Sequence, residues 1–344
     1  MLKRNTLPTK LPTLVGITAL TQVAIITRDT EETVKQLAKA LNPGSFKIVS
    51  AKSPELFNTT YKDKPENWSM KAGLTWIGNT QLEIIQPTSG RTVYDDYLNE
   101  RDQKAGIEHI YLAAQDFDKT RSHYEAMGYP LQQEAQLNAA GKIGFLPVPA
   151  LPKFLQHMAA RFGYTKTQQS LKLDIELAKF PKGVSQRVAL RAAIPEKWLP
   201  SHQPSLFESV PTDAPLRDLD AFYVLTKDLE TLVAAYAKLT DKKPEITPYY
   251  DDHLPGEGHL AQIRVGTSLL VLVQPKQGEI ASLLSDLGEG LTLLRGRPQE
   301  DVSTTIRLLT SLGWTCHKSA STLGKKRAFA KHPAIPFALW VTEE

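Results

Sequence analysis

Three polar side chains lie where their residue types and spacing suggest chemistry. Glu83 lies in the otherwise apolar run 82–85, and a carboxylate on so apolar a strand must find a cation or a hydrogen-bond donor. Gln22 and His109 each lie seven residues before an aspartate, within two segments of similar pattern. Carboxylate, amide and imidazole groups all bind divalent metal ions. The sequence therefore points first to metal chemistry.

A second group of suitable ligand types lies in a single loop. It contains Asp251, Asp252, His253 and His259. The proline and two glycines between them indicate a turn, and polar side chains in such loops are mostly solvated. This loop is the weaker candidate for a metal site.

Four segments of the chain share one rhythm that would position such residues. Each begins with a short β-rich run, crosses a polar step and continues into an amphipathic helix of about a dozen residues. We expect these helices over residues 30–41, 117–127, 229–239 and 302–312. Two units also close alike, because 76–87 and 264–275 both read as strand, glycine turn, strand and Gln-Pro stop. The repeat predicts four units of one strand, one helix and about three further strands.

The units are grouped in two pairs, and a proline-rich stretch separates the pairs. Six prolines lie between residues 181 and 215, a density that stiffens a chain and excludes regular helix. We predict an N-terminal pair with the metal site over residues 1–180, a linker over 181–217 and a C-terminal pair over 218–344. The predicted fold class is α+β.

Composition excludes several classes of function. The 41 basic and 37 acidic side chains give a formal charge of +4, and no run of five Lys or Arg suggests nucleic-acid binding. The longest apolar-leaning stretch, 11–26, is too polar for a membrane span. The single cysteine, Cys316, allows neither an intramolecular disulfide nor a Cys-rich zinc site. Without a small-residue cleavage site near the start, we expect a cytoplasmic protein.

Three stretches, 21–29, 78–87 and 106–116, carry a resemblance to a known superfamily. They resemble the vicinal oxygen chelate superfamily, which includes glyoxalase I, methylmalonyl-CoA epimerase, bleomycin-resistance proteins and extradiol dioxygenases. The segment Gly106-Ile-Glu-His109-Ile looks much like the epimerase-type segment preceding a metal histidine. The resemblance implies tandem βαβββ modules, four in two pairs, that form a curved sheet around one divalent metal ion.

The resemblance also implies a ligand set, because the first and last strands of each module supply the ligands in this superfamily. Carried over by position, the set is Gln22, Glu83, His109 and Glu176, similar to that of glyoxalase I. Such donors suit Zn, Ni, Co, Mn or Mg, with Fe less favoured. The ion would stabilise an enediolate formed when a carboxylate removes the proton next to a carbonyl. Glu176 is the first candidate for that catalytic base and Glu83 the second.

The fourth ligand has an alternative. Glu176 requires that the closing strand of the second module lie within 171–181. If residues 153–157 form that strand instead, Gln156 or His157 would be the fourth ligand. Residues 153–162 could also form a helical lid, since the chain between the third and fourth strands is longer than a hairpin needs.

The C-terminal pair has apolar residues where the N-terminal pair has ligands. Ala221 corresponds to Gln22, Val271 to Glu83, and Leu291 or Leu293 to His109. These side chains cannot hold a metal ion. We therefore expect a degenerate copy that keeps the fold and covers the first pair or forms a dimer surface.

These observations favour a metal-dependent lyase or isomerase of the glyoxalase or epimerase type, acting on a small carbonyl compound. An extradiol-type dioxygenase is the enzymatic alternative, but its Fe(II) is usually held by two histidines and one glutamate, and only His109 is at hand. A bleomycin-resistance-like binding protein, which sequesters a ligand without metal, is the non-enzymatic alternative. The expected partners are a small-molecule substrate and a second copy in a homodimer, with neither nucleic acid nor membrane.

Overall fold

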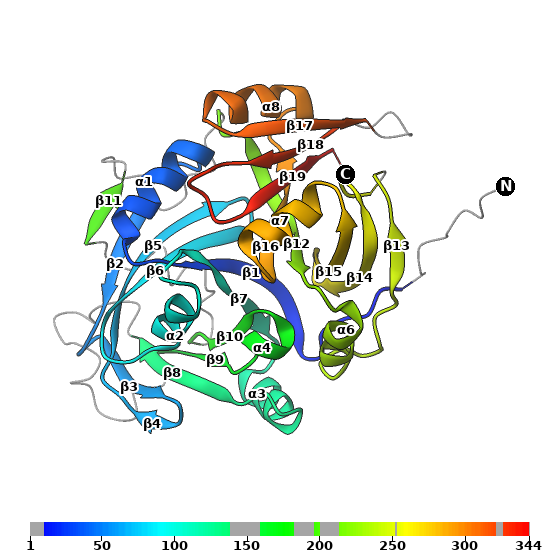
Figure 1. Ribbon diagram of the computed structural model, residues 1–344. Helices are drawn as coiled ribbons and strands as arrows, with labels where there is room; N and C mark the ends of the chain where they lie inside the picture. The colour runs from blue at the N-terminus through cyan, green and yellow to red at the C-terminus, as the bar shows by residue number, and fades with distance from the viewer. Residues whose placement is uncertain are drawn as a thin grey trace.

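The computed structural model describes residues 10–137, 159–181, 196–199, 213–251, 253–320 and 326–343. Within these residues the strands form two curved sheets, which lie side by side in Figure 1. The first sheet contains β1 (Ile17–Ile26), β2 (Phe46–Ala51), β3 (Leu56–Tyr61), β4 (Lys64–Pro65), β5 (Ser69–Ile77), β6 (Thr80–Ser89), β7 (Gly106–Ala114), β8 (Leu131–Leu137), β9 (Ala160–Thr165), β10 (Asp174–Lys179) and β11 (Lys197–Leu199). The second contains β12 (Leu216–Leu225), β13 (Thr247–Tyr249), β14 (Glu257–Val265), β15 (Ser268–Gln277), β16 (Gly290–Pro298), β17 (Thr315–Ala320), β18 (Lys326–Lys331) and β19 (Ala338–Thr342).

The eight strands of the second sheet follow the same order as β2-β5-β6-β1-β7-β10-β9-β8 of the first, which confirms the predicted tandem modules. The first runs β11-β2-β5-β6-β1-β7-β10-β9-β8-β3-β4, and the second runs β13-β14-β15-β12-β16-β19-β18-β17. In each sheet two modules meet at a central antiparallel pair, β1 with β7 and β12 with β16. The closing strand of each module lies parallel to its first strand, as β6 does to β1 and β10 to β7. The fold is α+β, with paired βαβββ modules.

The four predicted helices are present, and an aspartate N-cap precedes each of them. They are α1 (Thr30–Leu41), α3 (Phe117–Ala126), α6 (Leu229–Ala237) and α8 (Val302–Ser311). An aspartate precedes each helix, and its side chain accepts a hydrogen bond from a backbone N–H of the first turn. Such N-caps satisfy donors that have no partner within the helix. The polar step of the repeat is therefore a helix-capping signal.

Two further helices, not expected from the sequence, occupy the concave side of the sheets. The segment between the first two modules forms α2 (Val93–Glu100), and the segment between the last two forms α7 (Glu279–Leu287). Apolar residues of α2 join a buried cluster with the inner faces of β1, β6 and β7, and α7 does the same in the second sheet. Figure 1 shows α2 inside the curve of the first sheet. Each curved sheet is thus filled partly by the helix that connects its two modules.

The helical lid predicted over residues 153–162 is wrong at its C-terminal end. Residues 160–162 lie in β9, which pairs with both β8 and β10, so they complete the sheet instead of forming a helix. The short helix α4 (Gln168–Leu171) follows β9. The earlier part of the proposed lid, with Gln156 and His157, lies outside the described residues.

The two halves share one core. Buried residues of both sheets and of α1, α6 and α8 form a continuous hydrophobic cluster. The indole Nε1 of Trp314 donates to the backbone oxygen of Ala40 at 2.7 Å, across the two halves. Thr80 donates in the same way to the backbone oxygen of Leu219 at 3.1 Å. The boundaries 1–180, 181–217 and 218–344 stay a prediction, although β11, inside the predicted linker, pairs with β2 of the first sheet.

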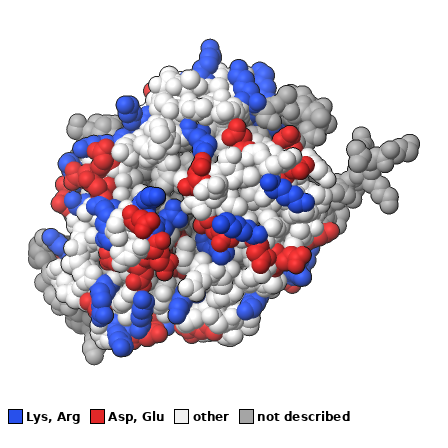
Figure 2. Space-filling view, viewed as in Figure 1, with Lys and Arg blue, Asp and Glu red and all other residues white. Residues whose placement is uncertain are grey.

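The surface gives no sign of a specialised charge distribution on the face in view. Figure 2 shows Lys and Arg interspersed with Asp and Glu over that face, in keeping with the small net charge of the chain. No helix among the described residues is long and apolar enough to cross a membrane. The cytoplasmic location and the homodimer stay predictions.

Candidate metal centre

The strand register of the first sheet brings the candidate residues into two adjacent rows. Side chains of directly paired residues point to the same face of a sheet. The first row contains Leu74, Glu83, Ala24, His109 and Asp174 in order across β5, β6, β1, β7 and β10. The second row contains Trp76, Gln81, Gln22, Tyr111 and Glu176 across the same strands. Residues far apart in sequence thus meet on the concave face.

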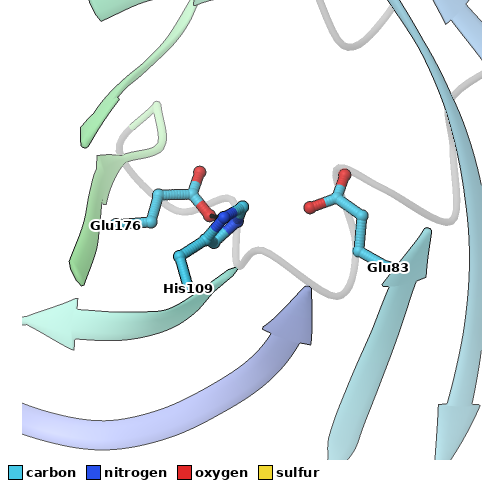
Figure 3. Close-up of side chains that lie close together, drawn as sticks. All are labelled: Glu83, His109 and Glu176. Carbon is cyan, nitrogen blue, oxygen red and sulfur yellow. Dashed lines mark ion pairs between the residues drawn. The ribbon is translucent and has the colours of Figure 1, made fainter. Parts of the chain in front are cut away.

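Three of the four predicted ligands lie together in this concave face. One candidate ligand atom from each of Glu83, His109 and Glu176 lies within 4.8 Å of the others, and this is the only such group found in the described residues. Ligand atoms about 2 Å from a shared ion lie at most about 4 Å apart, so small side-chain movements would complete the shell. Figure 3 shows His109 and Glu176 side by side, with Glu83 pointing toward them from the opposite side.

The cluster is buried, and two of its atoms have no hydrogen-bond partner. His109 is fully buried, and Glu83 and Glu176 are 9% and 8% exposed. The Nε2 atom of His109 and the Oε2 atom of Glu176 lie 3.6 Å apart, and neither makes a hydrogen bond within the described structure. Buried polar atoms are normally satisfied. A divalent cation would satisfy both, so these residues fit the metal that the fold implies.

Gln22 lies next to this group but contacts it through nitrogen. Its side-chain Nε2 donates to the Oε2 atom of Glu83. Amides bind metal ions through oxygen, so Gln22 would act as a ligand only with its amide turned over. In the present arrangement Gln22 orients the Glu83 carboxylate.

Burial and neighbouring charges shift the pKa values of Glu83 and His109 strongly. Burial and the nearby Glu176 carboxylate raise the pKa of Glu83 to about 8, against the opposing effects of His109 and Gln22. Burial alone would lower the pKa of His109, but the Glu108 and Glu176 carboxylates outweigh it and raise the pKa to about 10. A bound cation would reverse this balance, because ligands must be deprotonated.

Glu108 lies directly behind the histidine, and no pattern in the sequence singles it out. The register of β1 and β7 skips one residue of β7 between His109 and Ile107, so Glu108 forms a β-bulge, a feature that re-aims side chains. Its Oε2 atom lies 2.5 Å from Nδ1 of His109. A carboxylate on the second ring nitrogen fixes the tautomer and orientation of a metal-binding histidine.

Asp174 extends this arrangement and was also missed. It is hydrogen-bonded to Glu108, and that contact together with burial raises its pKa well above the usual range, with burial the larger cause. The backbone N–H groups of Thr167 and Gln168 donate to its Oδ1 atom at 2.8 and 2.7 Å. Both residues lie within segments discussed above, Glu108 beside His109 and Asp174 two residues before Glu176. Only the bulge and the burial reveal their role.

The site lies between a closed end and an open end of the curved sheet. On the closed side, the Tyr94 ring of α2 stacks on His109 with a centroid distance of 6.3 Å, and its hydroxyl donates to Tyr164 at 2.7 Å. On the open side lies a pocket of about 820 Å³ lined by Trp76, Tyr111 and Phe180 among others. Tyr111 belongs to the same row as Glu176, so the pocket opens next to the cluster.

The second sheet repeats this geometry without polar ligands. The register of β12, β15, β16 and β19 aligns Ala221 with Gln22, Val271 with Glu83, Leu293 with His109 and Trp340 with Glu176. This register also decides between the two residues considered for the histidine position, in favour of Leu293. The inner face is a buried apolar cluster, as expected for a degenerate copy.

The competing loop does not form a metal-binding group in the part of the chain described. Asp251, His253 and His259 are described, whereas Asp252 lies outside the described residues. The Oδ1 atom of Asp251 accepts a hydrogen bond from the backbone N–H of Gly256 at 2.5 Å, which closes the turn. These three residues are not part of the ligand group found in the described chain.

Comparison with known proteins supports the resemblance seen in the sequence. Residues 21–145 match the family model of the Glyoxalase/Bleomycin resistance protein/Dioxygenase superfamily. This segment is therefore similar in sequence to that superfamily, and the predicted resemblance is confirmed. A search of curated protein sequences finds no significant match.

Solved structures extend the likeness to the whole chain at the level of the fold. A triply substituted variant of 4-hydroxymandelate synthase from Streptomyces coelicolor matches 95% of this chain and 92% of its own, at 13% identity and a TM-score of 0.59. A fusion protein of a xylose isomerase-like TIM barrel and a 4-hydroxyphenylpyruvate dioxygenase matches 99% of this chain at 10% identity and a TM-score of 0.51. The chain spans 51% of that fusion protein. Identities this low establish the fold and leave the reaction open.

Proposed function

We propose that this protein is a metal-dependent lyase or isomerase that moves a proton next to the carbonyl group of a small substrate. The observation that supports this most is the buried group of Glu83, His109 and Glu176, with polar atoms that lack partners in the described structure. One imidazole and two carboxylates suit Zn, Ni, Co, Mn or Mg. Glu83, His109 and Glu176 would hold the ion, and Gln22 would join them with its amide turned.

The chain's own groups suit proton transfer. A bound divalent ion supplies Lewis-acid polarisation of a carbonyl oxygen and stabilises the enediolate charge. Glu83 and Glu176 approach the candidate ion position from opposite sides, so a substrate carbonyl held at that position would have a carboxylate on either side of it. Glu176 is the preferred base because its row borders the open pocket. It takes the proton from the carbon next to the carbonyl and returns it to the neighbouring carbon, so the reaction needs no oxidant.

Glu83 is the second candidate for the base. Its carboxylate approaches the site from the side opposite Glu176, where it can accept a proton from a bound substrate. The buried cluster of α2 and the surrounding aromatic rings covers the closed side of the site. Exclusion of water strengthens the interactions among these charges.

A dioxygenase is the second candidate, and one observation favours it. Both solved structures compared above are described as a 4-hydroxymandelate synthase or as containing a 4-hydroxyphenylpyruvate dioxygenase. The donor set argues against it, because non-haem Fe(II) oxygenases use two histidines and one carboxylate and the group found here has a single histidine. A ligand-sequestering protein of the bleomycin-resistance kind is the third candidate.

Metal analysis and a proton-exchange assay test the proposal. Purified protein is analysed for bound metals and then incubated in deuterated water with α-ketoaldehyde thiol adducts and with acyl-CoA thioesters. We expect stoichiometric Zn, Ni or Co and deuterium incorporation next to a carbonyl, lost in Glu176→Gln by about a hundred-fold or more. Stoichiometric iron with oxygen uptake would favour the dioxygenase, and ligand binding without any metal would favour the sequestering protein.

A further inference from the structure

Gln81 is a buried polar residue with no assigned role in the site described above. It is fully buried on β6, and neither its Nε2 nor its Oε1 atom has a hydrogen-bond partner in the described structure. Leaving a buried amide unsatisfied costs about 1–3 kcal/mol for each group. A polar group of this kind inside a native protein calls for an explanation, such as a ligand that completes it.

The register places Gln81 between the candidate metal centre and the pocket. Gln81 and Glu83 lie two residues apart on β6 and point to the same face, and Asn79 lies in the turn just before this strand. Asn79 lines the pocket and Glu83 belongs to the metal group. The cross-strand partner of Gln81 on β5 is Trp76, which also lines the pocket. A ligand reaching from the pocket to the metal centre would pass this amide.

The second sheet provides an internal comparison. Gln22 pairs with Gln81, and the equivalent pair is Ala221 with Leu269. The copy that lost its ligand residues therefore also has an apolar residue in the position of Gln81. The fold itself accepts leucine there, so the amide accompanies the polar site and is not a requirement of the module.

We propose that Gln81 is a substrate-binding residue whose amide hydrogen-bonds a second polar group of the carbonyl substrate. The proposal rests on the proposed function, since the substrate carbonyl is taken to lie at the metal centre. Nε2 donates to an oxygen of the substrate, and Oε1 accepts from a hydroxyl or amide where one is present. Gln81 thus selects carbonyl compounds that carry a further oxygen close to the reacting carbon.

The pocket beyond Gln81 indicates what the rest of the substrate is like. Trp76, Tyr111 and Phe180 line it, and Tyr111 and Phe180 meet edge to face at a centroid distance of 6.4 Å. Aromatic walls bury apolar surface and favour a flat or apolar group. The substrate class is therefore a small carbonyl compound with a neighbouring oxygen and an aromatic or apolar body.

Ligand binding to the zinc-loaded protein tests this assignment. The probes are phenylglyoxylate, which has both features, and glyoxylate, which lacks the apolar body, and affinity is measured by isothermal titration calorimetry. We expect phenylglyoxylate to bind more tightly than glyoxylate. Gln81→Leu, which copies Leu269, should weaken phenylglyoxylate binding about ten-fold, the equivalent of one or two hydrogen bonds. Gln81→Met serves if the leucine variant fails to fold.

A stability measurement separates a binding role from a structural one. Because the Gln81 amide has no partner in the described structure, Gln81→Leu should keep its zinc and unfold at an equal or higher temperature than wild type. Gln262→Leu, at a half-buried glutamine on β14 of the second sheet, is the control and should leave phenylglyoxylate binding unchanged.

Each other outcome overturns the assignment. Unchanged affinity in Gln81→Leu, or in Gln81→Met where the leucine variant fails to fold, would do so. Loss of zinc or a marked fall in melting temperature in both variants would do so as well. Wild-type protein that binds neither probe would overturn the substrate class. The titrations are repeated without zinc, so a protein that binds no metal would refute the proposed function while the comparison at Gln81 still stands.

Discussion

Glu83 makes the metal-free site sensitive to pH. Its pKa is raised from an ordinary value of 4.5 to about 8 in the folded protein, by burial and then by Glu176. Between those two values the folded state binds more protons than the unfolded state, so stability falls as pH rises. The raised pKa of His109, about 10, acts in the same direction from pH 6.5 upward. We expect the metal-free protein to lose stability steadily from pH 5 to pH 9, measured by chemical denaturation.

The same experiment with Glu83→Gln gives the control. This variant has no titrating group at position 83, so the slope between pH 5 and pH 7 should become shallower, leaving the His109 contribution at higher pH. Metal affinity of the wild type should rise over the same range, because the ligands must lose their protons to bind. A slope unaffected by the substitution would mean that Glu83 does not titrate in this range.

Removal of a single ligand should abolish metal binding. Glu83→Gln and His109→Ala each delete one of the three groups that lie together, and we expect stoichiometric metal to be lost while circular dichroism stays native. His253→Ala, in the competing loop, should leave the metal content unchanged. Metal analysis after dialysis checks all three variants. Loss of metal only in His253→Ala would transfer the site to the loop.

Glu108 should act on the metal through the histidine. Its carboxylate lies 2.5 Å from Nδ1 of His109, and loss of such a supporting partner typically lowers metal affinity 10- to 100-fold. Glu108→Gln should therefore reduce zinc affinity by about that factor without changing the number of bound ions, measured by competition with a chelator. A variant with wild-type affinity would reduce Glu108 to a packing role.

The candidate ligand residues could be predicted only because the modules repeat along the sequence. Gln22, Glu83, His109 and Glu176 were found because module positions recur, and the structure brings three of them together with Gln22 alongside; their role as ligands stays a proposal. Glu108 escaped notice because strict alternation places neighbours of a strand residue on the opposite face. The bulge at this position breaks that rule, and no residue pattern in the segment predicts the bulge.

At the scale of elements, helices with a local signal were predictable and helices set by packing were not. Each predicted helix follows a capping aspartate. By contrast, α2 and α7 connect modules and are amphipathic over only two to three turns. Their stability comes from burial inside the curved sheets, and short helices depend on such packing. The repeated strand-then-helix pattern therefore does not predict them.

The aspartate caps give a prediction for α1, the helix that covers β5 and β6. The side chain of Asp29 accepts from the backbone N–H of Glu32 at 2.9 Å. Asp29→Ala should lower the free energy of unfolding by about 1 kcal/mol, whereas Asp29→Asn, which keeps the accepting oxygen, should lower it much less. Thermal and urea denaturation provide the comparison. Equal losses in the two variants would assign the effect to charge instead of capping.

At the scale of the whole molecule, the second sheet retains a module pair that has no polar ligands. Its inner face is filled by apolar residues and by α7, while its outer side contributes to the core shared with the first sheet. The metal group needs a fixed geometry, and strands held on both faces supply it. The C-terminal half thus packs against the sheet that carries the candidate site.

Trp314 tests whether the two halves fold as one unit. It is 2% exposed, follows α8 in the second half and donates to the backbone oxygen of Ala40 at the end of α1 in the first. Trp314→Ala should cost about 3–5 kcal/mol, as for other buried aromatic residues. Because the core is continuous, both halves should still unfold in a single transition, now at a lower free energy of unfolding. Hydrogen exchange should therefore become faster in residues of both halves. If exchange rates rose only in the C-terminal half, the halves would be independent, and the metal centre would not depend on its degenerate copy.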